Sequence, residues 1–261
     1  MNLSELSRTA FLPLLCRAGI SEGNDSVFND PMAVLFLERL ISNSSEEEKK
    51  RILNWRKKYT GINRRDAKAR MMTVRNFDNI ATQFIENNPG CTVINLACGF
   101  DTRFWRIKAD KRKYIELDLP EMIALKSEIL KDHINYELIG CSVLDTSWID
   151  KVTSNVNRNF LLLAEALFYY LPKPDVVRIL QVISQKFDRS QIVLDMAPEK
   201  YTKGLWKGLI QLESWAWDID VSFISGINDP REIESYGNGL KVIGVAKGNV
   251  GPIITVSINA A

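Results

Sequence analysis

Residues 93–103 read Val93-Ile94-Asn95-Leu96-Ala97-Cys98-Gly99-Phe100-Asp101-Thr102-Arg103, an apolar run that ends in small residues and a polar triplet. A buried parallel strand passes in this way into a tight loop that can hold a cofactor at its carboxyl end. A second strand-like run, residues 113–118, ends in the acid Asp118. This spacing is typical of nucleotide-binding folds, in which a carboxylate accepts hydrogen bonds from ribose hydroxyls. The two segments together predict an enzyme with an adenosine-containing cofactor.

The bulk composition argues against several classes of protein. The chain has 261 residues, of which 46% are hydrophobic and 25% charged, and its net charge is +2. These values are ordinary for a globular protein, and the balanced charge gives no reason to expect a nucleic-acid partner. No apolar run approaches the roughly 20 residues of a membrane helix. We therefore expect a cytoplasmic protein that binds neither nucleic acid nor a membrane.

The cysteines give no sign of a metal site. They are far apart in the chain, without a Cys-x-x-Cys pair, and the chain has a single histidine. Such spacing argues against zinc sites, iron–sulfur sites and disulfide frameworks. We therefore expect no metal and four free thiols, which are Cys16, Cys91, Cys98 and Cys141.

The chain divides into two unequal parts. Residues 1–90 are mostly helical in pattern, for example over 69–85, and predict an N-terminal helical extension. Residues 91–261 alternate short apolar runs with helical patterns such as 174–187, which indicates an α/β domain with a doubly wound, mainly parallel sheet. The strand-like runs are 92–97, 113–118, 136–141, 160–166 and 191–196.

The last part of the chain departs from this alternation. The runs 240–247 and 252–259 flank a turn that contains two glycines, which predicts an antiparallel hairpin. Before the hairpin, residues 197–230 form an insertion with a helical stretch and several tryptophans. This insertion has two interpretations: an extra helix packed on the core, or a lid that walls a pocket for an apolar or aromatic substrate.

The loop after the first strand separates two kinds of cofactor. A nicotinamide site of the usual type needs G-x-G-x-x-G, in which the glycines allow the turn and the approach of the pyrophosphate. Here the three positions are Ala97, Gly99 and Thr102, so the middle glycine alone is present, and the chain has no P-loop. A cofactor with ribose and adenine but no phosphates fits this loop better. S-adenosyl-L-methionine is such a cofactor.

Four motifs follow one another in a fixed order along the chain. They are an arginine ahead of the first strand, Arg75, and then Asn95–Arg103, Glu116–Pro120 and Ala164–Pro172. Together they resemble the leucine carboxyl methyltransferase family, which includes polyketide O-methyltransferases of the tetracenomycin type. The resemblance implies a Rossmann-like class I methyltransferase fold, with a mainly parallel seven-stranded sheet closed by a C-terminal antiparallel hairpin. Residues 91–261 would then be the methyltransferase domain and 197–230 its lid.

The resemblance also implies roles for individual residues. Arg75 is expected to pair with the methionyl carboxylate, Asp118 to accept the ribose hydroxyls, and Glu165 to contact the amino-acid end of the cofactor. Asp101 and Arg103 are expected to pair with each other. The residues expected at S-adenosyl-L-methionine, or at its product S-adenosyl-L-homocysteine, are Arg75, Ala97, Cys98, Gly99, Asp118, Leu119, Ser142, Val143 and Glu165.

Two positions depart from the family pattern. Ala97 replaces the first glycine, and its methyl group either crowds the cofactor or fits harmlessly if the residue has φ below zero. Ser142 replaces an acid that is expected at the adenine amino group. A hydroxyl accepts that hydrogen bond without the charge, so we expect the cofactor affinity to be weaker than in typical relatives by about 1 kcal/mol.

These residues predict an O-methyltransferase. His133 lies in a helical stretch remote from the expected site. The absence of a histidine base favours as acceptor a carboxylate or acidic hydroxyl of a small or medium-sized, polyketide-like molecule, and an aspartate, glutamate or tyrosine base stays open. The catalytic residues are not identified, and Tyr169 and Tyr170 are candidates for the pocket wall. Three alternatives stay open: a protein C-terminal carboxylate as the acceptor, a non-catalytic relative that binds cofactor weakly, and an NAD(P)-dependent oxidoreductase.

Overall fold

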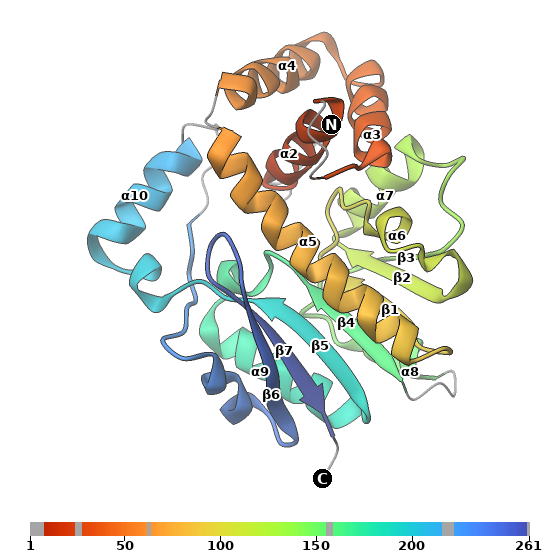
Figure 1. The fold of residues 1–261 in the computed structure, drawn as a ribbon, viewed down its shortest axis with the longest axis vertical. Helices are drawn as coiled ribbons and strands as arrows, with labels where there is room; N and C mark the ends of the chain where they lie inside the picture. The colour runs from red at the N-terminus through yellow and green to blue at the C-terminus, as the bar shows by residue number, and fades with distance from the viewer. Residues whose placement is uncertain (1–7, 24–27, 62–63, 155–158, 216–221, 260–261) are drawn as a thin grey trace.

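The fold is organised around a seven-stranded sheet with helices on both of its faces (Figure 1). The computed structural model describes residues 8–23, 28–61, 64–154, 159–215 and 222–259. The strands are β1 (Thr92–Leu96), β2 (Lys113–Asp118), β3 (Glu137–Gly140), β4 (Phe160–Ala164), β5 (Ser190–Asp195), β6 (Leu240–Lys247) and β7 (Pro252–Ile258). The helices are α2 (Phe11–Glu22), α3 (Pro31–Ser42), α4 (Glu46–Gly61), α5 (Arg64–Asn87), α6 (Arg103–Arg106), α7 (Pro120–Ile129), α8 (Ser147–Thr153), α9 (Lys173–Lys186) and α10 (Gly204–Trp215), with short 3₁₀ turns η1 (Ala109–Lys111), η2 (Phe168–Tyr170), η3 (Glu199–Thr202) and η4 (Pro230–Tyr236).

The first five strands are parallel and the last two form an antiparallel hairpin. The strand order is β3-β2-β1-β4-β5-β7-β6, and β7 lies antiparallel between β5 and β6. The predicted mainly parallel sheet with a closing hairpin is therefore confirmed. The strands β2 and β3 lie on one side of β1, whereas β5, β7 and β6 lie on the opposite side of its neighbour β4. The chain therefore leaves β1 and β4 in opposite directions, and the loops after these two strands diverge. Such a divergence opens a crevice at the carboxyl edge of a parallel sheet.

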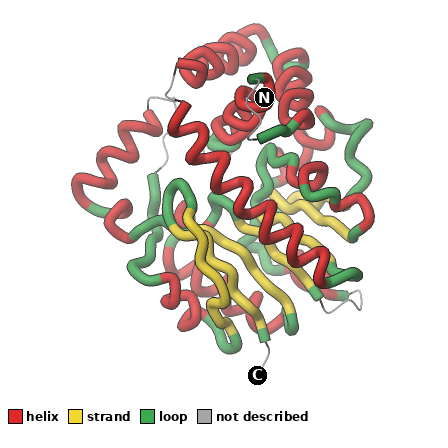
Figure 2. Tube along the Cα trace, in the orientation of Figure 1, coloured by secondary structure: helices red, strands yellow, loops and turns green. Residues whose placement is uncertain are grey.

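Alternate residues of the central strands face two hydrophobic clusters. Val93 and Leu161 pack with α5 on one face, whereas Ile94 and Leu162 pack with α8 and α9 on the other. Every residue of β1 and β4 is buried, as expected for parallel strands that are covered on both sides. Figure 2 shows the strands as a continuous layer with α5 crossing in front of it.

Helices α2, α3 and α4 form a layer over the carboxyl edge of the sheet (Figure 1). Asp30 caps the start of α3, where its side chain accepts a hydrogen bond from Ala33 N at 3.0 Å. Phe100 joins this layer to the loop after β1. Its ring packs edge-on against Phe11 and Phe36, with ring centroids 5.0 and 5.1 Å apart. The N-terminal helices therefore pack directly on the loop that the sequence marks as a cofactor site.

The insertion at 197–230 contains α10, which lies at the edge of the molecule (Figure 1). A helix buried in a core hides its apolar side chains, whereas α10 exposes several of them. The helix is therefore a wall at the surface and not a core helix. Within the described residues, no helix combines the length and the apolar character of a membrane span. The exposed apolar side chains of α10 are Leu205, Trp206, Leu209 and Leu212.

Phe100→Ala removes the ring that joins the helical layer to the loop after β1. Because Phe100 is only 1% exposed, the substitution leaves a cavity among aromatic rings, and we expect the free energy of unfolding to fall by about 3–5 kcal/mol. Ile243→Ala is the control, since Ile243 is 51% exposed on the edge strand β6, and its effect should stay within about 0.5 kcal/mol. Urea denaturation followed by circular dichroism measures both variants. Equal losses would contradict the role given to Phe100.

Candidate functional site

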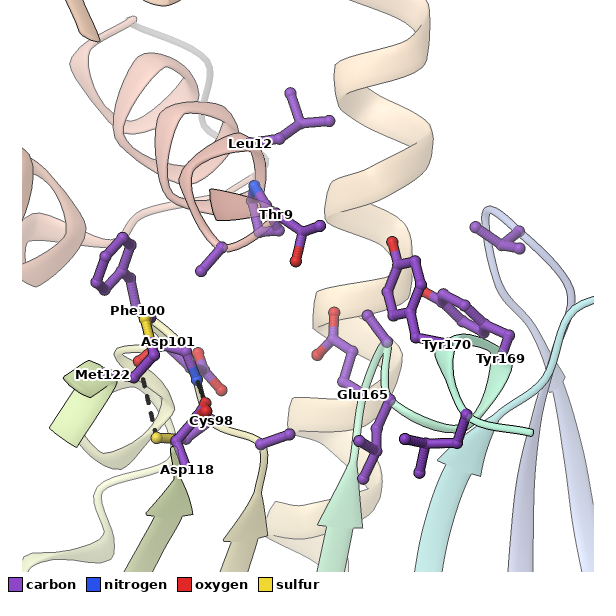
Figure 3. Close-up of a pocket in the computed structure, with 18 of the residues that line it drawn as sticks. Thr9, Leu12, Cys98, Phe100, Asp101, Asp118, Met122, Glu165, Tyr169 and Tyr170 are labelled. Carbon is purple, nitrogen blue, oxygen red and sulfur yellow. Dashed lines mark hydrogen bonds between the residues drawn. The ribbon is translucent and has the colours of Figure 1, made fainter. Parts of the chain in front are cut away.

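A cavity of about 550 Å³ opens at the carboxyl edge of the sheet, in the crevice between the loops after β1 and β4. Its volume is in the usual range for small-molecule sites. Figure 3 shows Asp118 on one side of this cavity, Glu165 and Tyr170 on the other, and Leu12 of α2 above them. The cavity therefore has walls from the sheet edge and a roof from the N-terminal helical layer.

The structure brings most of the predicted site residues together at this cavity. Apart from Arg75, every residue predicted at the cofactor lines it, and so do both tyrosines predicted for the pocket wall. Their contact with a cofactor stays a prediction. These lining residues, from the loops after β1, β2, β3 and β4, are Ala97, Cys98, Gly99, Asp118, Leu119, Ser142, Val143, Glu165, Tyr169 and Tyr170.

Arg75 is the exception, because the structure does not place it at the cavity. Its side chain is exposed on α5, and the arginine of α5 that lines the cavity is Arg70, five residues earlier. Five residues rotate a helix by one full turn and about 140° more, so these two arginines face different directions. The structure therefore does not bring Arg75 to the cavity with the other predicted residues.

Left-handed backbone shapes the loop after β1. Ala97 and Gly99 have φ values of 50° and 49°, and a Cβ added to Gly99 would lie 3.0 Å from the Cβ of Ala10 in the roof. Asp118 holds the loop in place, since its carboxylate accepts hydrogen bonds from Gly99 N at 2.6 Å and Leu119 N at 2.7 Å. Ala97 therefore lacks the negative φ that would make its methyl group harmless. A left-handed conformation costs a non-glycine residue about 1–2 kcal/mol.

Asp118 and Ser142 present oxygen atoms from the loops after β2 and β3. Burial raises the pKa of Asp118 above its usual range, while the hydrogen bonds from Gly99 N and Leu119 N favour its ionised form. A carboxylate has about four lone-pair positions, so two amide donors leave capacity for ligand hydroxyls. Ser142 Oγ accepts a hydrogen bond from Leu144 N at 3.2 Å, which fixes the direction of its hydroxyl group.

Arg103 joins three segments beneath the cavity. Its fully buried guanidinium pairs with Asp78 of α5 at 2.7 Å, with Asp101 at 2.6 Å and with Glu165 after β4. The expected pair of Asp101 and Arg103 is therefore present, and two further carboxylates join it. Burial acts to raise the pKa of Asp101, but Arg103 and Arg106 outweigh burial and hold that pKa far below its usual range. Asp101 is therefore ionised at any physiological pH.

A second buried ion pair supports the same loop from behind. Lys126 and Glu116 are fully buried, with 2.7 Å between Nζ and Oε2, and Lys126 also donates to the backbone oxygen of Asp101. Tyr136 donates to the same carboxylate oxygen at 3.1 Å. Burial acts to raise the pKa of Glu116, whereas Lys126 beside it favours the ionised form. Glu116, the first acid of the Glu116–Pro120 motif, therefore supports the loop and does not face the cavity.

The half of the cavity opposite Asp118 has an aromatic and apolar wall. The ring of Tyr169 packs between those of Tyr170 and Phe223, with centroid distances of 4.7 and 4.6 Å. Ile224 N donates to the backbone oxygen of Tyr169 at 2.7 Å, which ties the end of the insertion to this turn. The insertion thus supplies part of the wall. The apolar and aromatic lining residues of this half are Leu12, Leu167, Tyr169, Tyr170, Tyr201, Trp206, Leu209, Ile210 and Phe223.

The groups at the cavity that could act as a general base are carboxylates and phenols. No histidine or lysine is among the described residues that line it. His133 lies elsewhere, beside Arg39, with 3.3 Å between Nε2 and Nη2. Burial raises the pKa of Tyr169 well above its usual range, and the nearby carboxylates of Asp195 and Glu165 raise it further. This phenol therefore stays protonated at neutral pH.

Several residues at or behind the cavity are not among the residues that the sequence predicts at the cofactor. Arg17, Arg70 and Asn95 line it, and Asp195 lies behind Ala166, whose N–H donates to its carboxylate at 2.7 Å. A polar residue inside an apolar run is a usable sequence signal for Asn95 in β1 and for Asp195 at the end of β5. Arg17 and Arg70 belong to ordinary amphipathic helices, so only the packing of those helices reveals them.

Ala97→Gly should relieve the left-handed strain in the loop after β1. We expect the free energy of unfolding to rise by about 0.5–1 kcal/mol, because the relief exceeds the entropy that glycine adds to the unfolded chain. Ala81→Gly is the matched control, since Ala81 lies in the helical backbone of α5 and the same change should cost about 1 kcal/mol there. Urea denaturation measures both. A loss of stability in both variants would show that Ala97 is not strained.

Known proteins resemble this chain over much of its length. The sequence profile of the family described as leucine carboxyl methyltransferase matches residues 10–184. The tetracenomycin polyketide synthesis O-methyltransferase TcmP of Streptomyces glaucescens is 30% identical over 169 residues, which span 64% of this chain and 60% of TcmP. The S-adenosyl-L-methionine-dependent methyltransferase dpfgK of Gibberella zeae is 27% identical over 255 residues, which span 92% of this chain and 82% of dpfgK.

Solved structures share the fold at low sequence identity. A DUF574 family protein from Streptomyces avermitilis superposes with a TM-score of 0.57 at 12% identity, over 87% of this chain and 97% of that chain. Magnesium protoporphyrin IX methyltransferase from Synechocystis, solved with S-adenosyl-L-homocysteine, gives a TM-score of 0.50 at 13% identity, over 85% of this chain and 92% of that chain. Since the family profile covers more than half of the sequence, the chain belongs to the leucine carboxyl methyltransferase family.

Proposed function

We propose that this protein is an S-adenosyl-L-methionine-dependent O-methyltransferase whose cofactor lies in the polar half of the cavity and whose acceptor lies against the aromatic wall. The observation that carries the proposal is Asp118, which ends β2 inside the cavity and holds the left-handed loop after β1. The names of TcmP and dpfgK support the reaction class. The alignment covers 60% of TcmP, so the activity is assigned from the site and not from that relative alone.

The lining residues fit the adenosine part of the cofactor. Asp118 has acceptor capacity for two vicinal hydroxyls, as ribose recognition requires. Cys98 and Val143 are nearly buried apolar side chains next to it, suited to the faces of a base. Ser142 offers a hydroxyl for the edge of the base, without the charge that an acid would bring. The residues of this half therefore match a nucleoside without phosphates.

The charged residues fit the amino-acid part of the cofactor. Glu165 faces the cavity (Figure 3) and its carboxylate forms an ion pair with Arg103, so it is suited to accept hydrogen bonds from an ammonium group. Arg70 lines the same cavity from α5 and takes the role that the sequence motif gave to Arg75. A guanidinium group matches the two oxygens of a carboxylate.

In this reaction the protein positions the acceptor and excludes water from the site. When bound, the sulfonium cofactor supplies a methyl group that is already activated toward a nucleophilic oxygen. The aromatic wall holds the acceptor in line with that methyl group, and the roof formed by α2 excludes water. Since the described lining includes no histidine or lysine, the acceptor that fits is a carboxylate or an acidic hydroxyl. The extent of the wall suits a polyketide-like molecule better than a peptide C-terminus.

Substitution of two arginines of α5, Arg70 and Arg75, tests where the cofactor binds. Arg70→Ala removes charge-assisted hydrogen bonds to the methionyl carboxylate and should weaken the binding of S-adenosyl-L-homocysteine by roughly 10-fold to 100-fold. Arg75→Ala is the control, because Arg75 is exposed and away from the cavity, and its affinity should match that of the unmodified protein. Isothermal titration calorimetry measures both. The opposite ranking would restore Arg75 as the cofactor arginine.

Methyl transfer itself tests the proposed function. With S-adenosyl-L-methionine and a panel of aromatic carboxylic acids and acidic phenols, we expect a mass increase of one methyl group in at least one acceptor. Asp118→Ala should abolish the transfer, whereas His133→Ala should preserve it, because His133 lies beside Arg39 and away from the cavity. If S-adenosyl-L-homocysteine does not bind, the proposal fails. Binding without transfer to any member of the panel would favour a non-catalytic relative.

A further inference from the structure

Two aspartates occupy matching positions on either side of the central strands. Asp118 ends β2 and accepts a hydrogen bond from Gly99 N at 2.6 Å, in the loop after the neighbouring strand β1. Asp195 ends β5 and accepts one from Ala166 N at 2.7 Å, after the neighbouring strand β4. Both donors have left-handed backbone, with φ values of 49° and 56°. The cavity is thus bordered by two similar clamps, in each of which an aspartate carboxylate accepts a backbone N–H from a left-handed residue after the neighbouring strand. The clamp formed by Asp195 and Ala166 lies outside the half of the cavity that is predicted to hold the cofactor.

Ala166 lies at the centre of the acceptor side. It follows Glu165 directly and precedes the turn that carries Tyr169 and Tyr170, and all four residues line the cavity. A left-handed conformation is unfavourable for alanine and persists only where the surroundings impose it. Asp195 supplies that constraint, because its carboxylate accepts the Ala166 N–H from a position that is only 4% exposed.

We propose that Asp195 is a positioning residue for the acceptor side of the cavity: its carboxylate fixes the left-handed turn at Ala166, and thereby sets where Tyr169 meets the acceptor. Asp195 is not among the residues that line the cavity, so it acts through Ala166 and not by contact with a substrate. The role in turnover rests on the proposed methyltransferase function, whereas the clamp itself does not.

The surroundings of Asp195 make the ionised form of its carboxyl group unfavourable. Glu165 from the end of β4, Arg103 from α6 and Tyr169 from η2 are the ionisable groups that interact with it. Burial and the charge of Glu165 raise the pKa of Asp195 to about 7, although the Ala166 amide and Arg103 act in the opposite direction. The residue is therefore partly ionised at neutral pH, in a buried place where an amide or apolar side chain would be less costly.

The sign of the pH effect follows from this pKa. An unfolded aspartate titrates near about 3.9, so between about pH 4 and pH 7 the folded protein binds more protons at Asp195 than the unfolded chain does. Folding stability from this residue is therefore highest at the acidic end of the window and is lost as the pH rises to about 7. A neutral residue at this position removes the contribution of Asp195 to the decrease in folding stability with rising pH.

Two variants separate the hydrogen bond from the charge. Asp195→Asn keeps an oxygen that accepts the Ala166 N–H, whereas Asp195→Ala removes it. Hydrogen exchange of the full chain, read by mass spectrometry over residues 165–171, should be faster by about 10-fold in Asp195→Ala and nearly unchanged in Asp195→Asn. Asp118→Ala is the matched control, since it should loosen the loop at 97–101 and leave 165–171 protected. Unchanged exchange in Asp195→Ala, or equal damage from both Asp195 variants, would overturn the proposal.

Urea denaturation between pH 5 and pH 8 gives an independent measurement, also if Asp195→Ala fails to fold. The unmodified protein should lose stability with rising pH more steeply than Asp195→Asn. Asp132→Asn should keep the original slope, because the side chain of Asp132 is 66% exposed. Identical slopes for the protein and Asp195→Asn would contradict the raised pKa of Asp195, whereas the clamp is tested by the exchange measurement. Calorimetry should give Asp195→Asn and the unmodified protein the same affinity for S-adenosyl-L-homocysteine within about 2-fold. If the unmodified protein does not bind S-adenosyl-L-homocysteine, the methyltransferase function is refuted, but the test of the clamp is not affected.

Discussion

The buried guanidinium of Arg103 is the interaction on which the site depends. A charge without solvent is costly unless carboxylates and hydrogen bonds compensate it, and here the compensation comes from Asp78, Asp101 and Glu165. Each of these acids belongs to a different segment: helix α5, the loop after β1 and the end of β4. Because the planar guanidinium has a fixed geometry, it sets these three segments relative to one another. The floor of the cavity is thus determined by electrostatics as much as by apolar packing.

The two halves of the cavity differ in how they are built. The polar half consists of short loops that directly follow strands, and backbone hydrogen bonds to Asp118 and the buried Lys126–Glu116 pair hold them. The aromatic half is formed largely by the turn after β4 and by the insertion with α10, whose outer face is exposed. A rigid scaffold with a variable wall is a common way for one fold to serve many substrates. The same division explains why the cofactor is easier to infer than the acceptor.

Much of the fold could be predicted from local sequence. The run 113–118 coincides with β2, and the glycine-containing turn at 248–251 joins β6 and β7 as a hairpin, because apolar periodicity and turn residues act over short distances. The features that the sequence alone could not predict involve long-range information. Whether Arg70 or Arg75 faces the cavity depends on which face of α5 meets the sheet, and the φ of Ala97 depends on the contacts of its loop. Neither can be obtained from a motif.

The ion cluster also determines when the site can form. Arg103 reaches Glu165 across 62 residues of sequence, and Thr102 donates to Asp30 across 72. Contacts between such distant residues require large loops to close, and they therefore form late in folding. The loop after β1 has a strongly local sequence signature, yet its final geometry awaits the arrival of α3, α5 and β4. A nascent or partly unfolded chain would contain the whole motif and still lack the binding site, so that ligand affinity reports the completion of folding and not merely the presence of the strand.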